Sequence, residues 1–149
     1  MTITLRPARR EDQQTIVSLI RQAKLNPRNL HWERFLVAED AGQIVGVRQV
    51  RVHAQGTHEV GSGFVLPEYR GQGISARLMN EILSQEKGAV YLLCRDKWAS
   101  YYEQFGFRHV PVTQRPTDFL KEYRIGRIMT TLISVFVKDK IRIIPMKRG

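Results

Sequence analysis

The sequence predicts an α/β fold, and three observations carry this prediction. The stretch from Glu59 to Leu83 combines a β-like run, a glycine turn and apolar residues at helical spacing. Residues 35–52 contain two runs rich in β-branched residues around a polar turn, which is typical of a hairpin. Residues 90–94 are nearly all apolar, as in a strand buried on both faces.

The first half of the chain is predicted to contain a strand, a helix and three further strands. Residues 2–7 alternate like a short strand, and a helix begins at about Glu11, with Ile16, Val17, Leu19, Ile20 and Ala23 on its apolar face. A polar connection leads to the hairpin strands, 35–39 and 44–52. The next strand follows Gly56 and contains Gly61 and Gly63, and glycines inside a strand often mark a bulge or the close approach of a ligand.

The second half is predicted to contain strands and helices in alternation. In order, these are a helix ending near Leu83, a strand 89–94, a helix ending at Gly106, a strand 107–112, a helix from Asp118 to about Phe136, and a final strand 141–146. The segment 132–137 allows a competing interpretation. Its β-branched residues would suit a strand paired with the final run.

Length and composition favour one domain with its own core. The 149 residues are 42% hydrophobic and 26% charged, which is an ordinary globular balance. The one cysteine, Cys94, cannot form an internal disulfide, and its apolar neighbours favour a buried thiol. No apolar run has the length of a membrane span, and residues 1–7 lack the apolar region of a signal peptide. We therefore expect a cytoplasmic protein with no membrane partner.

Positive charge is concentrated at the end of the chain. The formal net charge is +10, and residues 115–149 carry nine Lys or Arg against three Asp or Glu, a net charge of +6. Such a field attracts coenzyme A, acidic substrates, anionic surfaces or nucleic acid. Because a charge excess is more often a solvated face than a specific site, it does not favour nucleic acid as a partner.

The glycine turn before the helix that ends near Leu83 has the features of an anion site. Glycine lets the backbone approach an anion, and the first N–H groups of a helix are unpaired and lie at the positive end of its dipole. The turn is not a P-loop, because Ile74 and Ser75 follow Gly73 where Lys and Ser or Thr are needed. It is a poor dinucleotide fingerprint, because only Gly71 and Gly73 are present.

Two segments together resemble the GNAT superfamily of N-acetyltransferases. Residues 70–75, Arg-Gly-Gln-Gly-Ile-Ser, resemble the family's coenzyme A pyrophosphate loop, R/Q-x-x-G-x-G/A. Ser75 departs from this pattern, but serine is small enough to leave the loop open. About 30 residues downstream, the segment around Tyr102-Glu103 and Gly106-Phe107 resembles the family's F-Y-E-x-x-G-F helix end. Two motifs in this order are more specific than either one alone.

The resemblance covers roughly Ile3 to Val110 and implies a fold and an activity. The fold is the GNAT (acyl-CoA N-acyltransferase) fold, a mixed and mostly antiparallel sheet with helices on both faces, in a single domain 1–149 whose basic segment 115–149 diverges. The activity is acetyl transfer from acetyl-CoA to a primary amine of a small molecule or peptide. The residues implied to bind acetyl-CoA are Phe64, Val65, Arg70, Gly71, Gln72, Gly73, Ile74 and Ser75.

The resemblance also implies catalytic roles. Tyr102 matches the family's general acid near the thioester sulfur, and Glu59 lies where some members carry the base that deprotonates the amine through a water. His58 and His53 are alternative bases. The backbone N–H of Val65 resembles the family's donor to the thioester carbonyl. The four histidines show no metal-ligand spacing, so no metal is expected.

Two other function classes remain open from the sequence. A GNAT-like domain that binds acyl-CoA without catalysis would have no activity to lose on substitution of Tyr102. A basic nucleic-acid-binding module would show affinity that falls steeply with salt and does not depend on coenzyme A. The segment 115–149 is also a candidate homodimer surface.

Overall fold

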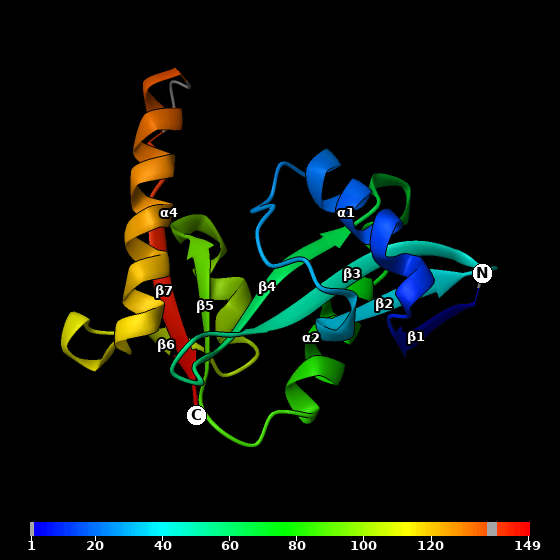
Figure 1. The fold of residues 1–149 in the computed structure, drawn as a ribbon, viewed down its shortest axis with the longest axis horizontal. Helices are drawn as coiled ribbons and strands as arrows, with labels where there is room; N and C mark the ends of the chain where they lie inside the picture. The colour runs from blue at the N-terminus through cyan, green and yellow to red at the C-terminus, as the bar shows by residue number, and fades with distance from the viewer. Residues whose placement is uncertain (1, 137–139) are drawn as a thin grey trace. The chain divides into compact units, whose positions relative to one another are not determined.

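The computed structural model describes residues 2–136 and 140–149, in which three successive strands follow the first helix and strands and helices then alternate (Figure 1). The strands are β1 (Ile3–Pro7), β2 (Phe35–Asp40), β3 (Gln43–Val52), β4 (His58–Val65), β5 (Val90–Arg95), β6 (Arg108–His109) and β7 (Ile143–Arg148). The α-helices are α1 (Gln13–Gln22), α2 (Ile74–Ser84), α3 (Ala99–Glu103) and α4 (Thr117–Phe136). The chain divides into two compact units, one reaching to Arg51 and including Val60–Lys87, the other made of Val52–Glu59 and Gly88–Gly149.

The strands form a mixed sheet in the order β1-β2-β3-β4-β5-β7-β6. The pairs β1–β2, β2–β3, β5–β7 and β6–β7 are antiparallel, and β4 pairs with β5 in parallel through His58↔Val90 and Glu59↔Tyr91. This arrangement confirms the predicted α/β fold with a mixed, mostly antiparallel sheet.

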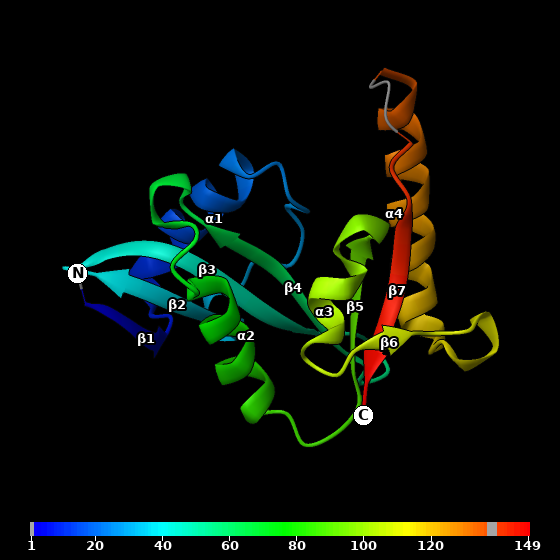
Figure 2. The same cartoon turned by 180° about the vertical axis from the view of Figure 1, so that it is seen from behind.

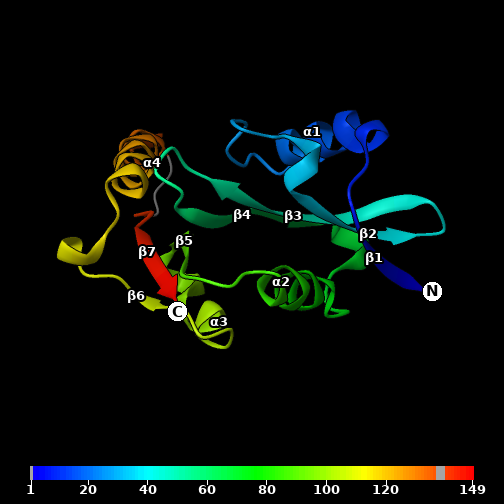
Figure 3. The same ribbon diagram turned by 60° about the horizontal axis from the view of Figure 1, so that its bottom comes forward.

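In the first unit, α1 and α2 cover opposite faces of the strands (Figure 3). Of the apolar face predicted for α1, Ile16, Leu19 and Ile20 are buried, whereas Val17 and Ala23 are half-buried; α2 buries Ile74, Leu78, Met79, Ile82 and Leu83. Gly46 of β3 lets α2 approach closely, because a Cβ there would lie 3.2 Å from Ile74 and 3.3 Å from Leu78. The spacing of apolar residues thus determines which face of each helix is buried.

An ion-pair cluster joins the start of the chain to β2. The guanidinium of Arg6 donates to Asp12 at 2.7 Å and to Glu39 at 2.6 Å. The hydrogen bond from Arg6 is the main reason that the pKa of Asp12 lies below its usual value. Arg6, although only partly buried, is thus paired with two carboxylates.

In the second unit, β7 lies between β5 and β6 (Figure 2). A core cluster of Tyr91, Val110 and Phe119 holds α4 against the strands, with ring centroids 5.1 Å apart between Tyr91 and Phe119. Cys94 is buried as predicted, and burial raises the pKa of its thiol to about 11. The thiol is therefore a structural group and not a ready nucleophile.

Asp118 ties the start of α4 to the segment between β3 and β4. Its carboxylate accepts hydrogen bonds from the Thr57 hydroxyl at 2.6 Å and from the backbone N–H of Gln55 at 3.0 Å. Burial alone would raise the pKa of Asp118, but these bonds and the one from the N–H of Phe119 outweigh burial and lower it. Because the carboxylate satisfies four donors, it fixes this segment to the helix.

Two predicted elements differ from the structure. The strand predicted over 107–112 is reduced to β6, because Val110 turns inward and Pro111 leads into a 3-10 turn, Val112–Gln114. The final strand begins at Ile143 and not at 141. The competing strand over 132–137 is wrong as far as Phe136, where α4 ends, and residue 137 lies outside the described residues.

Candidate functional site

The predicted phosphate loop connects β4 to α2 through a 3-10 turn, Pro67–Tyr69. Gly71 and Gly73 have φ angles of +78° and +76°, and a Cβ at either position would meet nothing within 4 Å. The two glycines are therefore needed for left-handed backbone and not for space against a neighbour. Residues 70–73 are exposed, so the loop is open to a ligand.

The N–H groups of this loop are available to an anion. Within residues 2–136 and 140–149, the backbone N–H groups of Gly71, Gln72 and Gly73 have no acceptor. They precede the first turn of α2, an 11-residue helix whose dipole is positive at this end. Unpaired backbone N–H groups at the start of a helix are suited to bind a diphosphate group.

The side chain of Arg70 links the loop to the end of β4 by a hydrogen bond. Its Nε donates to the carbonyl of Val65 at 3.0 Å, and its guanidinium lies 5.6 Å from the centroid of the Phe64 ring. Three predicted ligand-binding residues, Phe64, Val65 and Arg70, are thus brought together with the loop. The guanidinium keeps further N–H groups for a ligand, since one Nε bond uses only one of its five donors.

The glycines of β4 make room for arginine side chains of β3. A Cβ at Gly63 would lie 2.5 Å from the Arg48 guanidinium, and one at Gly61 would clash with Arg51. Ser62 between them has a φ of +55° and accepts a hydrogen bond from Arg51 at 2.8 Å. From the sequence, the two strand glycines were expected to mark a bulge or the close approach of a ligand. The sequence did not reveal that the approaching groups belong to the protein.

Tyr102 lies in α3, in the second unit. Its ring packs edge-on against Tyr101 and Phe107, with centroids 5.2 Å and 6.4 Å away, and Phe107 is fully buried. The N–H of Phe105 donates to the Tyr102 carbonyl, and Gly106 ends the segment with a φ of +88°. The Tyr102 hydroxyl has no hydrogen-bond partner in the described part of the chain, so it is available to a ligand.

Glu59 forms a buried pair with His53, also in the second unit. The Glu59 carboxylate lies 2.7 Å from His53 Nε2, and the two side chains are 7% and 9% exposed. The hydrogen bond to Glu59 raises the pKa of His53, against the lowering effect of burial. Two of the predicted candidate bases are therefore one coupled group, which sequence spacing did not show.

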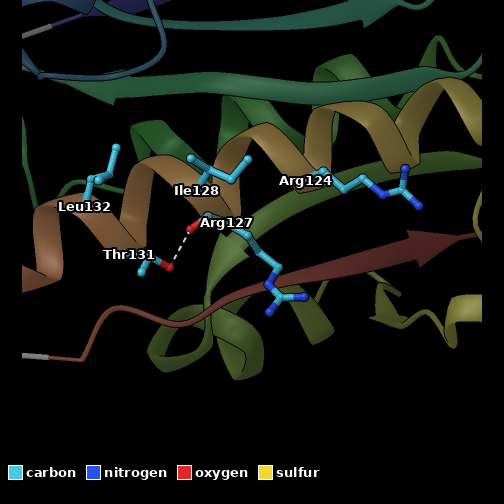
Figure 4. Close-up of a pocket in the computed structure, with 5 residues that line it drawn as sticks. All are labelled: Arg124, Arg127, Ile128, Thr131 and Leu132. Carbon is cyan, nitrogen blue, oxygen red and sulfur yellow. Dashed lines mark hydrogen bonds between the residues drawn. The ribbon is translucent and has the colours of Figure 1, made fainter.

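A shallow pocket of about 400 Å³ lies on the exposed side of α4, within the basic C-terminal segment (Figure 4). Arg124, Arg127, Ile128, Thr131 and Leu132 line it, and Thr131 donates a hydrogen bond to the Arg127 carbonyl at 2.8 Å. None of these residues belongs to the predicted site. The pocket combines apolar side chains with two guanidinium groups, and that of Arg127 lies 5.8 Å from the centroid of the Tyr123 ring.

The described residues contain no group of three or more His, Cys, Asp or Glu side chains arranged to hold a metal ion. Among the helices of residues 2–136 and 140–149, none has the length and apolar character needed to span a bilayer.

Comparison with protein families identifies the class to which this fold and loop belong. Residues 31–109, more than half of the chain, match the model of the acetyltransferase (GNAT) domain. The chain therefore belongs to the GNAT acetyltransferase family. This membership confirms the resemblance seen in the sequence and the class of enzyme, an acetyl-CoA-dependent N-acetyltransferase with acetyl-CoA as donor. A search of curated proteins gives no match.

Solved structures share the fold at low sequence identity. N-acetylglutamate synthase from Neisseria gonorrhoeae, complexed with coenzyme A and N-acetyl-glutamate, superposes with a TM-score of 0.77 and 18% identity over 99% of this chain, which spans only 35% of that protein. Rv2747 from Mycobacterium tuberculosis, in complex with CoA and NLQ, gives 0.72 and 21% over 97% of this chain and 98% of its own. Arabidopsis thaliana Naa50, in complex with the bisubstrate analogue CoA-Ac-MVNAL, gives 0.62 and 16% over 100% and 99%.

Proposed function

We propose that this protein transfers the acetyl group of acetyl-CoA directly to a primary amine, with the loop 70–75 binding the diphosphate and Tyr102 acting as general acid. The observation that carries the proposal is the loop, in which two left-handed glycines leave three N–H groups unpaired before α2. Phe64, Val65, Arg70, Gly71, Gln72, Gly73, Ile74 and Ser75 are the residues proposed to hold the donor.

Tyr102 supports the proposed chemistry through its free hydroxyl. In direct attack, the amine nitrogen bonds to the acetyl carbon, the carbon–sulfur bond breaks, and the nitrogen loses a proton while the departing thiolate gains one. The Tyr102 hydroxyl, which no described residue binds, would supply the proton to the sulfur. Its aromatic contacts fix the ring, which limits the orientations of that hydroxyl.

Glu59 is the proposed base, acting together with His53. A carboxylate that is hydrogen-bonded to a protonated imidazole is a weaker proton acceptor than one facing a neutral imidazole. Because the pKa of His53 is raised, the pair becomes a better base as pH rises through that pKa. The rate of acetyl transfer should therefore increase over this pH range.

The acceptor is proposed to be the primary amine of a small molecule or a peptide. Two proteins of this fold support the proposal, one in complex with an acetylated amino acid, N-acetyl-glutamate, and one with the bisubstrate analogue CoA-Ac-MVNAL. A panel of amino acids, polyamines and N-terminal peptides, followed by release of free thiol, would identify the class.

Thermal stability with and without acetyl-CoA tests the loop. A ligand that binds only the native state at 100 times its Kd adds about 2.7 kcal/mol to the free energy of unfolding, which raises the melting temperature by several degrees. Gly73→Trp should abolish this rise. Gly42→Trp is the matched control, since Gly42 also has a left-handed φ and no neighbour near its Cβ, and the rise should persist there. No rise in the wild type at millimolar acetyl-CoA would refute the proposal.

Single-turnover kinetics test the acid. Tyr102→Phe should lower the rate of thiol release about a hundredfold while acetyl-CoA affinity stays unchanged, because the hydroxyl acts in the chemical step. Tyr101→Phe on the same helix is the control and should react at the wild-type rate. A Tyr102→Phe rate equal to that of the wild type would exclude Tyr102 as the acid. Binding of acetyl-CoA with no transfer to any amine would point to a non-catalytic domain.

A second copy of the chain is the proposed partner of α4. Ile128, Leu132 and Val135 lie at helical spacing and are 57–77% exposed, which is unusual for large apolar side chains. Sedimentation analysis should show a dimer in the wild type and a monomer for Leu132→Glu. A wild-type monomer at high micromolar concentration would exclude this partner.

A further inference from the structure

Arg48 of β3 is a buried cation without an acidic partner. It is 4% exposed, its Nε has no hydrogen-bond partner, and no carboxylate of residues 2–136 and 140–149 lies within 4 Å of its guanidinium. Arg6, in contrast, is more exposed and still bonds two carboxylates. A buried guanidinium is costly unless it is paired, so the environment of Arg48 needs an explanation.

The hydrogen bond that Arg48 does make leads to the phosphate loop. Its Nη2 donates to the hydroxyl of Ser75 at 3.2 Å. Ser75 is the second residue of α2 and the position where the sequence departs from the Gly or Ala of the family pattern. The contact explains why serine suits this position: Gly or Ala would offer Arg48 no hydroxyl as a hydrogen-bond acceptor.

The neighbouring strand also accommodates Arg48. A Cβ at Gly63 would lie 2.5 Å from Nη2 and 2.6 Å from Cζ, so any larger residue would force the guanidinium to move. Gly63 of β4 leaves space for the Arg48 guanidinium, and Ser75 of α2 accepts its hydrogen bond. The position of the charge is therefore fixed by the fold.

We infer that Arg48 is a positioning residue of the diphosphate site, which supplies buried positive charge behind the loop and holds Ser75 at the start of α2. Three features meet at this end of the helix: the free N–H groups of residues 71–73, the positive end of the helix dipole, and the Arg48 charge that no described carboxylate neutralises. A diphosphate anion bound to the loop would provide the missing counter-charge. This inference rests on the proposed function, since it assigns a further residue to the same site.

Calorimetric titration with CoA and thermal shift with pantetheine, which lacks the diphosphate, test the inference. Arg48→Met should weaken CoA binding about tenfold and leave the pantetheine shift unchanged, because a charge in a low-dielectric surrounding acts on the anion alone. Arg48→Lys, which keeps the charge, should bind CoA more tightly than Arg48→Met. The slope of log affinity for CoA against log salt concentration should be smaller in Arg48→Met than in the wild type.

A second variant moves the charge without removing it. Gly63→Ala should displace the guanidinium and reduce CoA affinity several-fold, again with no effect on pantetheine. Gly61→Ala is the matched control, because its Cβ would displace Arg51, which donates to Ser62, and not Arg48; the ratio of CoA to pantetheine binding should stay at the wild-type value. If Arg48→Met does not fold, the Gly63 and Gly61 pair decides the question.

The outcomes separate this inference from the function on which it rests. If the wild type binds no CoA, the proposed function fails. If the wild type binds CoA and both Arg48→Met and Gly63→Ala bind it with wild-type affinity, the inference is overturned. An equal loss for CoA and pantetheine would also overturn it, because it would mean that Arg48 has only a structural role.

Discussion

Replacement of Glu59 by Gln should reverse the direction in which the pKa of His53 is shifted. In the wild type the hydrogen bond that His53 donates to Glu59, at 2.7 Å, raises this pKa, and burial opposes the rise. Glutamine keeps the shape of the side chain and removes the charge. Burial then remains as the largest influence, since the charges of Glu122 and Asp118 each contribute less than burial does, and the pKa should fall below the ordinary value for histidine.

The stability change follows from the same pair. A hydrogen bond to a charged group contributes about 1.5–3 kcal/mol, so Glu59→Gln should lower the free energy of unfolding by about this amount at pH 6. Because the folded pKa of His53 is raised, the contribution of the pair is fully present below pH 6.5 and is lost as pH rises through the folded pKa. The difference between wild type and variant should therefore shrink toward pH 9.

Two measurements check this prediction. Histidine resonances followed by NMR from pH 4.5 to 9.5 give the pKa of His53, and urea unfolding at pH 6 and pH 9 gives the stability. Glu122→Gln is the control and should lower the pKa of His53 less than Glu59→Gln does, because the Glu122 charge contributes less to the raised pKa than Glu59 does. A wild-type pKa at or below 6.5, or no change in Glu59→Gln, would refute the reasoning.

Three further predictions concern the second unit. Asp118→Asn should lower the free energy of unfolding at pH 7 by about 1–3 kcal/mol in urea titrations, because Thr57 loses a charged acceptor; the difference should vanish as pH falls below 3.8, through the lowered folded pKa. Cys94 should react slowly with a thiol reagent at pH 7.5 in the native protein, since burial raises the pKa of its thiol to about 11, and Cys94→Ser should keep full acetyl-CoA affinity. Phe119→Ala should cost about 3–5 kcal/mol in the same urea titrations, because it opens a cavity beside Tyr91; a loss below 1 kcal/mol would mean that the cluster is not a core.

Several features of the fold were predictable because their signals are local. The strand, glycine turn and helix around residues 70–75 follow from apolar spacing and from two glycines in sequence, and the structure has both glycines at positive φ. Gly106 likewise has the positive φ expected after a helix, although α3 ends at Glu103 and not at Gly106. The length of β6 was not predictable, because the residues of 107–112 suit a strand and only the burial of Val110 turns the chain away.

The sequence by itself determined the order of the elements, the loop with its free N–H groups and the family to which the chain belongs. The elements and the loop each depend on residues within about a dozen positions of one another, where spacing and backbone preference act directly, and the family depends on two such local motifs in order. Only the tertiary structure decided that Glu59 pairs with His53, that Gly63 makes room for Arg48, and that Arg48 reaches Ser75, 27 residues away. These contacts depend on the register between neighbouring strands and on the face of the sheet from which each side chain projects. A shift of one residue in register would place each of these strand side chains on the opposite face of the sheet.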